Sequence, residues 1–271
     1  MKAVVIGGGT MGAGIVHLLL AHGHEVTLAE ADAERAEQGR RAVRQSLDKA
    51  QAKGKLADAD AVFANLATGA LPADAELVVE AVPENVPLKQ KVLGDAAQRC
   101  PDAVLASNTS SLSISEIAAG LPGERVLGMH FFNPVPVQQL VEVVHHDGVD
   151  PANVAKVRGW AEEMGKTVIE VRDSPGFATS RLGVAVGVEA IRMLEEGVAT
   201  AADIDTGMKL GYRWPMGPLE LTDLVGLDVR LAIAEHLAEQ LGPRFEPPAL
   251  LREKVARGEL GRKTGQGFFT W

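Results

Sequence analysis

A glycine-rich turn near the start of the chain constrains the fold more than any other feature of the sequence. The apolar run Lys2–Ile6 is typical of a buried parallel strand, and GGGTMG at residues 7–12 follows it with the spacing G-x-G-x-x-G, before a helical pattern over Ala13–His22. Such glycines allow a tight turn and bring the backbone close to a pyrophosphate, which binds amide groups at the helix N-terminus. The turn therefore predicts a dinucleotide-binding fold. Its expected cofactor contacts are Gly7, Gly9, Thr10, Met11 and Gly12.

An acidic residue at the end of the next strand completes this pattern. Glu25–Ala29 is a second predicted strand, and Glu30 follows it at about the 20-residue distance at which such folds place a carboxylate on the ribose diol. Glu30 would repel a 2′-phosphate, and residues 31–33 offer no arginine beside it. The sequence therefore favours NAD over NADP. A glycine-rich turn with an incidental acid is the competing interpretation, and the complete order of strand, loop, helix, strand and acid argues against it.

The composition indicates which cellular compartment and which classes of partner to expect. With 271 residues, 46% of them hydrophobic, the chain can bury a large core in one or two domains. Its net charge of −9 and pI near 5.3 argue against nucleic acid or an anionic membrane surface as partner. The single Cys100 leaves no internal disulfide and no cysteine cluster for a metal, and no apolar run is long enough for a signal peptide or a membrane span. We expect a cytoplasmic protein without a metal site.

A long polar helix predicted over Asp32–Lys53 carries basic residues. Lys49 and Lys53 are four residues apart and share a face, with Ser46 nearby. A solvated charged face is the ordinary interpretation. A phosphate-bearing substrate that passes over the helix is the more specific one.

Polar residues follow two further predicted strands. Leu77–Val82 precedes Glu84 and a helix that contains Lys89, at the strand end where doubly wound sheets place their ligand crevice. An ordinary helical charge pair is the alternative for Glu84 and Lys89, and local sequence alone prefers it. Ala103–Ala106 precedes the run SNTSS at residues 107–111, and capping of the next helix does not need all of these hydroxyls.

A histidine and a glutamate flank a proline turn. The strand predicted over Val126–Met129 reaches His130, and a second apolar run carries Glu142. If the turn reverses the chain, the imidazole meets the carboxylate, and a histidine held in this way can take a proton near neutral pH. A core histidine beside a surface glutamate is the alternative, and local sequence alone prefers it.

The order of these motifs resembles the L-3-hydroxyacyl-CoA dehydrogenases, especially the short-chain bacterial 3-hydroxybutyryl-CoA dehydrogenases, over nearly the whole chain. The resemblance implies NAD-dependent, reversible oxidation of (S)-3-hydroxyacyl-CoA to 3-oxoacyl-CoA. The matching segments are residues 7–14, Glu80–Asn85, Ser107–Leu112, His130–Pro134, Pro175–Phe177, Pro215–Leu221, Gly226–Asp228 and Gly261–Phe268.

The resemblance also implies roles for individual residues. His130 would be the base, Glu142 would orient and polarise it, and Ser110 and Asn133 would hold the substrate oxygen. The implied NAD contacts are Glu30, Ala81, Glu84, Lys89, Ser110, Asn133 and Lys263, and the implied substrate contacts are Ser46, Lys49 and Lys53 for coenzyme A, with Ser110 and Ser180.

Three departures from the family pattern bear on the site. Ser180 stands where the family commonly has asparagine before Arg181, and its shorter hydroxyl either keeps the same bond through water or loses it. Gln138 and Gln139 replace the usual Met-Lys, so a positive charge near the site is missing. The chain is also shorter than most relatives between Lys55 and Glu80, which alters the approach of coenzyme A.

The pattern becomes helical after Asp173. Residues 1–173 are predicted to form an α/β, Rossmann-like, doubly wound and mostly parallel sheet with the catalytic His/Glu pair, and residues 174–271 a smaller all-helical substrate and dimerisation domain. The apolar surface of the all-helical domain and the family resemblance imply a homodimer. Asp205 and Asp223 are expected to cap and pack helices. The predicted helices are Phe177–Glu195, Ala201–Gly211, Pro218–Leu241 and Pro248–Arg257.

The sequence is also compatible with other functions. The same fold could act on 3-hydroxyadipyl-CoA, or on a free hydroxy acid or sugar acid. A nucleotide-binding structural or sensing protein with weak catalysis is a third reading, motivated by Ser180.

Overall fold

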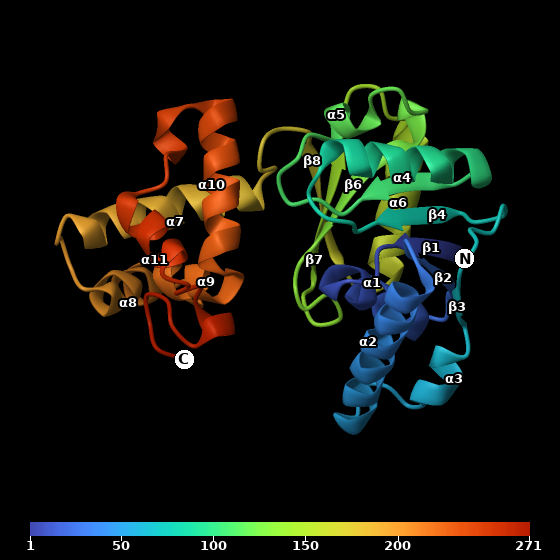
Figure 1. Ribbon diagram of the computed structural model, residues 1–271, viewed down its shortest axis with the longest axis horizontal. Helices are drawn as coiled ribbons and strands as arrows, with labels where there is room; N and C mark the ends of the chain where they lie inside the picture. Colours follow the sequence, from blue (N-terminus) through green and yellow to red (C-terminus); the bar gives the residue numbers. More distant parts are fainter. The chain divides into compact units, whose positions relative to one another are not determined.

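The computed structural model describes residues 1–271, which separate into two units, Met1–Asp173 and Ser174–Trp271 (Figure 1). The first unit is built on one eight-stranded sheet with strand order β3-β2-β1-β4-β5-β6-β7-β8. All neighbouring strands are parallel except β6 and β7. Its strands are β1 Lys2–Ile6, β2 Glu25–Ala29, β3 Leu66–Thr68, β4 Leu77–Glu80, β5 Val104–Ser107, β6 Val126–Phe131, β7 Leu140–His145 and β8 Thr167–Arg172.

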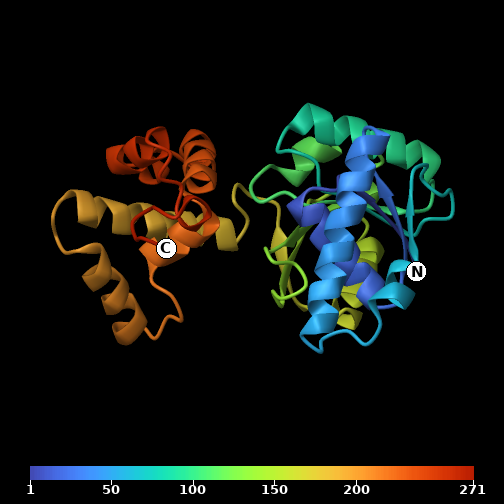
Figure 2. The same cartoon turned by 60° about the horizontal axis from the view of Figure 1, so that its bottom comes forward.

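Helices cover both faces of this sheet. α4 and α5 lie on one face, and α1, α2 and α6 pack with the strands into one apolar core on the other (Figures 1 and 2). This arrangement confirms the predicted Rossmann-like fold. The strand order reverses between β1 and β4, and such a reversal opens a ligand crevice at the carboxyl ends of the strands. The helices are α1 Thr10–Ala21, α2 Ala33–Ala52, α3 Ala59–Phe63, α4 Val86–Arg99, α5 Ile114–Ala118 and α6 Pro151–Glu163.

Side-chain caps explain where several of these helices begin. Asp32 accepts a hydrogen bond from the amide of Arg35 at the start of α2, and Asn85 accepts one from Leu88 at the start of α4. Asp150 caps α6 in the same way. The sequence patterns do not predict α3, β3 or α6, because these elements are short or lack a clear apolar face.

The glycine turn between β1 and α1 has the geometry its sequence requires. Gly7 has a φ of +102°, a backbone conformation that residues with a side chain rarely adopt. A Cβ on Gly12 would lie 1.7 Å from the carbonyl oxygen of Gly7. Gly9 is the N-cap of α1 and provides no side-chain hydrogen bond, so the first amide groups of the helix have no side-chain cap.

The second unit consists of helices α7 Thr179–Glu195, α8 Ala201–Gly211, α9 Pro218–Val225, α10 Leu227–Leu241 and α11 Ala249–Ala256. The single helix predicted over Pro218–Leu241 is wrong. Gly226 separates α9 from α10 with a φ of +105°, a conformation that a continuous right-handed helix excludes.

Two buried aspartates stabilise the second unit as expected. Asp205 accepts hydrogen bonds from the amides of Leu219 and Glu220 at the start of α9. Asp223 accepts from the amides of Phe268 and Phe269, both at 2.8 Å, and thereby fixes the C-terminal segment. The predicted capping and packing roles are confirmed. No helix in either unit combines the length and apolarity needed to cross a membrane.

Candidate active site

His130 and Glu142 meet across the antiparallel strands β6 and β7. The register places the two residues opposite each other, and Nδ1 of His130 lies 2.6 Å from Oε2 of Glu142. Glu142 has an exposed fraction of 0% and His130 of 7%. A carboxylate can only accept, so Nδ1 carries the proton of the neutral ring and Nε2 carries its lone pair. The proline turn therefore brings the imidazole and the carboxylate together, and the glutamate lies in the core rather than on the surface.

The strand end after His130 is attached to the serine-rich loop that follows β5. Oδ1 of Asn108 accepts a hydrogen bond of 3.0 Å from the amide of Phe131. The ring of Phe132 lies 4.5 Å from the imidazole of His130, tilted by 44°. These contacts fix the imidazole relative to the loop. The sequence analysis assigned no role to Asn108.

Glu84 organises the serine-rich loop from the end of β4. Its Oε1 accepts hydrogen bonds from Oγ1 of Thr109 at 2.9 Å, the amide of Ser110 at 2.9 Å and Oγ of Ser110 at 3.2 Å. The Ser110 hydroxyl therefore donates a hydrogen bond to Glu84, and its oxygen can still accept one. Glu84 and Ser110, separate on the sequence, form one hydrogen-bonded group.

Lys89 lies beneath this group. Its ammonium nitrogen is 2.9 Å from Oε1 of Glu80, 3.3 Å from Oε2 of Glu84 and 3.2 Å from the carbonyl oxygen of Val82, and the side chain has an exposed fraction of 0%. Protein acceptors thus enclose the ammonium group. The direct contact of Lys89 with the cofactor stays a prediction.

Glu80 is a site residue to which the sequence analysis gave no role. It is the last residue of β4, fully buried, and accepts hydrogen bonds from Oγ of Ser107 at 2.7 Å and from the amide of Val82 at 2.6 Å, besides those from Lys89. Burial raises the pKa of the Glu80 carboxyl, although Lys89 and these donors oppose the shift. An acid at the end of the otherwise apolar strand LVVE was the signal that could have identified it.

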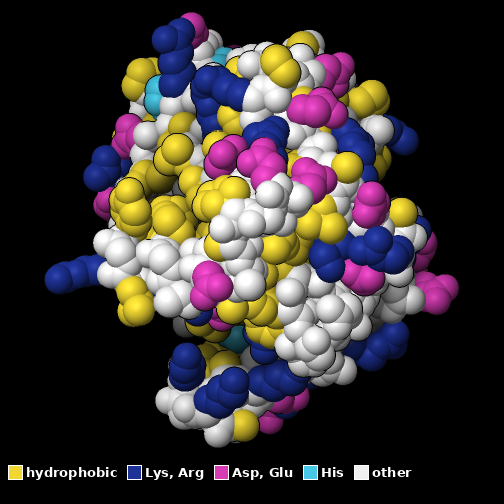
Figure 3. All heavy atoms as spheres, turned by 90° about the vertical axis from the view of Figure 1, so that its left-hand side faces the viewer, with side chains coloured by type: hydrophobic (Ala, Val, Ile, Leu, Met, Phe, Trp, Pro, Cys, Tyr) yellow, Lys and Arg dark blue, Asp and Glu magenta, His cyan; other side chains and the backbone are white.

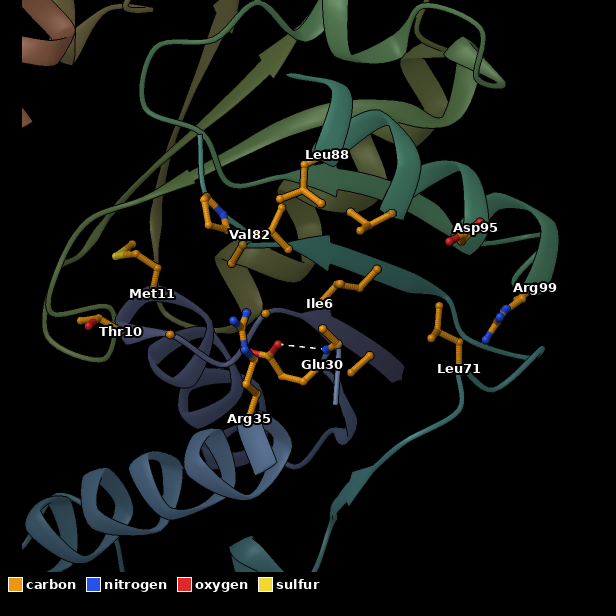
Figure 4. Close-up of a pocket in the computed structure, with 17 residues that line it drawn as sticks. Ile6, Thr10, Met11, Glu30, Arg35, Leu71, Val82, Leu88, Asp95 and Arg99 are labelled. Carbon is orange, nitrogen blue, oxygen red and sulfur yellow. Dashed lines mark hydrogen bonds between the residues drawn. The ribbon is translucent and has the colours of Figure 1, made fainter. Parts of the chain in front are cut away.

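A cavity of about 660 Å³ opens at the carboxyl ends of β1, β2 and β4 (Figure 4). It fits a dinucleotide, because the glycine turn and the uncapped start of α1 line it beside an acid. Oε1 of Glu30 accepts a hydrogen bond of 2.5 Å from the amide of Gly8, which fixes the carboxylate at the cavity wall. The predicted cofactor residues that line the cavity are Gly7, Gly9, Thr10, Met11, Glu30 and Ala81.

An arginine also lines this cavity near Glu30. Figure 4 shows the side chain of Arg35, from the first turn of α2, beside the carboxylate of Glu30. The sequence analysis considered only residues 31–33. Residues 31–33 contain none, but the start of α2 brings Arg35 back toward the end of β2.

The residues predicted to contact coenzyme A lie on α2. Oγ of Ser46 is 2.6 Å from Nδ1 of His17 on α1, whereas Lys49 and Lys53 are exposed at the C-terminal end of α2. Burial lowers the pKa of His17, with the positive charges of His22 and Lys166 adding to the shift. The coenzyme A contacts themselves stay predictions.

The remaining predicted site residues are Asn133, Ser180 and Lys263. Asn133 is exposed on the loop after β6. Ser180 lies in the first turn of α7, and Nζ of Lys263 pairs with the carboxylate of Asp228 at 2.6 Å, both within the second unit. Their contacts with substrate and cofactor stay predictions.

Comparison with known proteins gives matches over both units. The family model described as "3-hydroxyacyl-CoA dehydrogenase, NAD binding domain" matches residues 2–174, and the one for the C-terminal domain of the same family matches residues 176–271. A probable 3-hydroxybutyryl-CoA dehydrogenase of Deinococcus radiodurans is 42% identical, with 100% of both chains covered. A 3-hydroxybutyryl-CoA dehydrogenase of Mycobacterium tuberculosis is 40% identical, over 98% of this chain and 97% of that protein.

Solved structures give the same result. The crystal structure of FadB2 from M. tuberculosis superposes with a TM-score of 0.94 at 40% identity, covering 99% of this chain and 98% of the other. The (S)-3-hydroxybutyryl-CoA dehydrogenase PaaH1 from Ralstonia eutropha superposes with a TM-score of 0.92 at 38% identity, covering 100% and 98%.

Proposed function

The chain belongs to the 3-hydroxyacyl-CoA dehydrogenase family, which is NAD-dependent, and on this premise we propose that it interconverts short (S)-3-hydroxyacyl-CoA esters, such as 3-hydroxybutyryl-CoA, with their 3-oxo esters. The names of the D. radiodurans, M. tuberculosis and R. eutropha proteins support the short acyl chain. The observation that carries the proposal is the buried His130–Glu142 hydrogen bond. It joins β6 and β7 of the sheet whose strand β1 leads into the glycine turn.

His130 is the base in this proposal. NAD⁺, when bound, supplies the acceptor for the hydride that leaves C3 of the substrate. Nε2 of His130 takes the proton of the C3 hydroxyl at the same time, and the carboxylate of Glu142 stabilises the resulting imidazolium through Nδ1. In the reverse direction the protonated Nε2 returns the proton to the oxygen.

Ser110 and Asn133 are the proposed contacts of the substrate oxygen. The one proton of the C3 hydroxyl goes to Nε2 of His130, so the Ser110 hydroxyl contributes by donating to the C3 oxygen. To do so it turns from Glu84, while the Ser110 amide keeps its hydrogen bond to Oε1 of Glu84. Ser46, Lys49 and Lys53 are the proposed coenzyme A contacts, because two exposed ammonium groups on one helix face suit its phosphates. We propose Ser180 as a further substrate contact and Lys263 as a further cofactor contact.

The second unit is the proposed dimerisation domain. Figure 3 shows hydrophobic side chains gathered on one of its faces. Leu210 and Tyr212, at the end of α8, have exposed fractions of 78% and 74%, and Leu182 of α7 has 68%. Such residues suit an interface between copies. Sedimentation of the purified protein should give twice the chain mass, and Tyr212→Asp should shift it toward the monomer. A cytoplasmic location and a part in fatty acid metabolism belong to the same proposal.

The substrate test is a series of 3-oxoacyl-CoA esters of rising chain length, each assayed with NADH and with NADPH. We expect acetoacetyl-CoA with NADH to give the highest kcat/KM. Free acetoacetate and the 3-oxoadipyl ester are the comparisons for the other two substrate classes. A higher rate with either would replace the proposed substrate, and no turnover with any of them would leave a nucleotide-binding protein.

A further inference from the structure

We propose that Glu80 is a positioning residue for this site, which it serves without touching substrate or cofactor. Its buried carboxylate holds Lys89, Lys89 draws Glu84 into place, and Glu84 orients Ser110. This inference rests on the proposed function of Ser110.

The carboxylate of Glu80 is fully engaged within the protein. Both oxygens accept from Nζ of Lys89, at 2.9 and 3.1 Å, while Ser107 and the amide of Val82 supply the remaining hydrogen bonds. The parallel register of β4 and β5 places Ser107 directly beside Glu80. With no exposed surface, Glu80 can influence a ligand only through these neighbours.

Lys89 transmits this constraint to Glu84. The side chain of Glu84 has an exposed fraction of 42%, so on its own it would sample many rotamers. The ammonium of Lys89 is 3.3 Å from its Oε2, which leaves Oε1 to face Thr109 and Ser110. One oxygen of Glu84 therefore faces the cation and the other faces the serine. Because Oε1 also accepts from the amide of Ser110, this division fixes the position of Ser110.

Glu80 and Lys89 also fix the backbone at the wall of the proposed cofactor cavity. The amide of Val82 donates to Glu80, and the carbonyl of Val82 accepts from Lys89 at 3.2 Å. Val82 lines the cavity in Figure 4 together with Ala81. Glu80 and Lys89 therefore join the wall of the cofactor cavity to the serine-rich loop.

Stability alone does not account for this pair. Removing two charges from water is costly, and well-packed apolar residues in place of a buried ion pair are often neutral or stabilising. An apolar pair could not attract Glu84, however, because that attraction needs the charge of Lys89. The charge, rather than the packing, is the feature that the site uses.

A double-mutant cycle tests the inference. We measure kcat for acetoacetyl-CoA reduction in the wild type, Glu80→Gln, Glu84→Gln and Glu80→Gln/Glu84→Gln. Glu80→Gln should lower kcat by about tenfold with a smaller change in KM, and should have little further effect once Glu84 is glutamine. An equal loss in both backgrounds would overturn the proposal, because Glu80 would then act independently of Glu84.

A second variant separates positioning from folding. Glu80→Met/Lys89→Met removes both charges and should restore the thermal stability that Glu80→Gln loses, while kcat stays low. Wild-type kcat in this variant, or its failure to fold, would show a purely structural pair and overturn the proposal. Glu76→Gln, an exposed change just before β4, is the matched control. If the wild type and this control lack activity, the proposed function fails instead.

Discussion

Nδ1 of His130 donates a hydrogen bond of 2.6 Å to Oε2 of Glu142, and the carboxylate is fully enclosed by the protein. Enclosure strengthens this bond, because the low local dielectric favours charge-assisted contacts. The arrangement fixes the tautomer of the imidazole. It therefore predicts how substitution of each residue changes turnover.

Glu142→Gln should impair proton transfer while the fold persists. The amide is nearly isosteric but can donate to Nδ1, which would move the imidazole proton to Nε2 and remove the base. We expect kcat to fall by about 10²- to 10⁴-fold, in keeping with comparable substitutions beside catalytic histidines. Steady-state kinetics over a range of pH, with circular dichroism as the folding control, measure this. An unchanged rate and pH profile would exclude the orienting role.

Arg35 should become a phosphate ligand when Glu30 is removed. Both side chains line the same cavity, and the carboxylate of Glu30 repels a 2′-phosphate. Glu30→Ser should raise the ratio of kcat/KM for NADPH to that for NADH by about tenfold or more, since a guanidinium binds phosphate well. Adding Arg35→Ala should cancel the gain. A gain that survives without Arg35 would assign phosphate binding to another group.

His17 should make the protein sensitive to mild acid. Burial lowers its pKa in the folded state below the value of about 6.5 expected when unfolded, so the unfolded chain binds more protons in this range. Its contribution to stability is therefore complete above about pH 6.5 and declines as the pH falls below that value. The melting temperature should fall less between about pH 7 and pH 5 in His17→Gln than in the wild type. The same substitution at His236 is the control, and equal slopes in wild type and His17→Gln would contradict the prediction.

Much of the first unit could be predicted because its signals are local. β1 and β2 have the predicted bounds Lys2–Ile6 and Glu25–Ala29, since apolar runs and glycine turns specify them without reference to the rest of the chain. The proline turn between two apolar runs allowed a contact of His130 with Glu142, and the family resemblance favoured it over the core histidine and surface glutamate that local sequence preferred. The break at Gly226 was missed, because a glycine within a helical pattern does not reveal its φ.

The rest depends on which strands become neighbours. Glu80 meets Ser107 only through the parallel register of β4 with β5, and no local pattern specifies that pairing. Arg35 lies beside Glu30 because of the direction in which α2 begins. Contacts of this kind lie between elements, so the sequence indicated the His130–Glu142 pair but not the residues around it.

The most direct test of the central claim compares the wild type with His130→Gln. NADH oxidation is followed with acetoacetyl-CoA as substrate, and NADH binding is titrated by fluorescence in the same preparations. Loss of the proposed base should lower turnover by about 10²- to 10⁴-fold and leave NADH affinity unchanged, because the account assigns proton exchange to His130 and cofactor binding to the glycine turn. Turnover by His130→Gln at the wild-type rate would contradict the account.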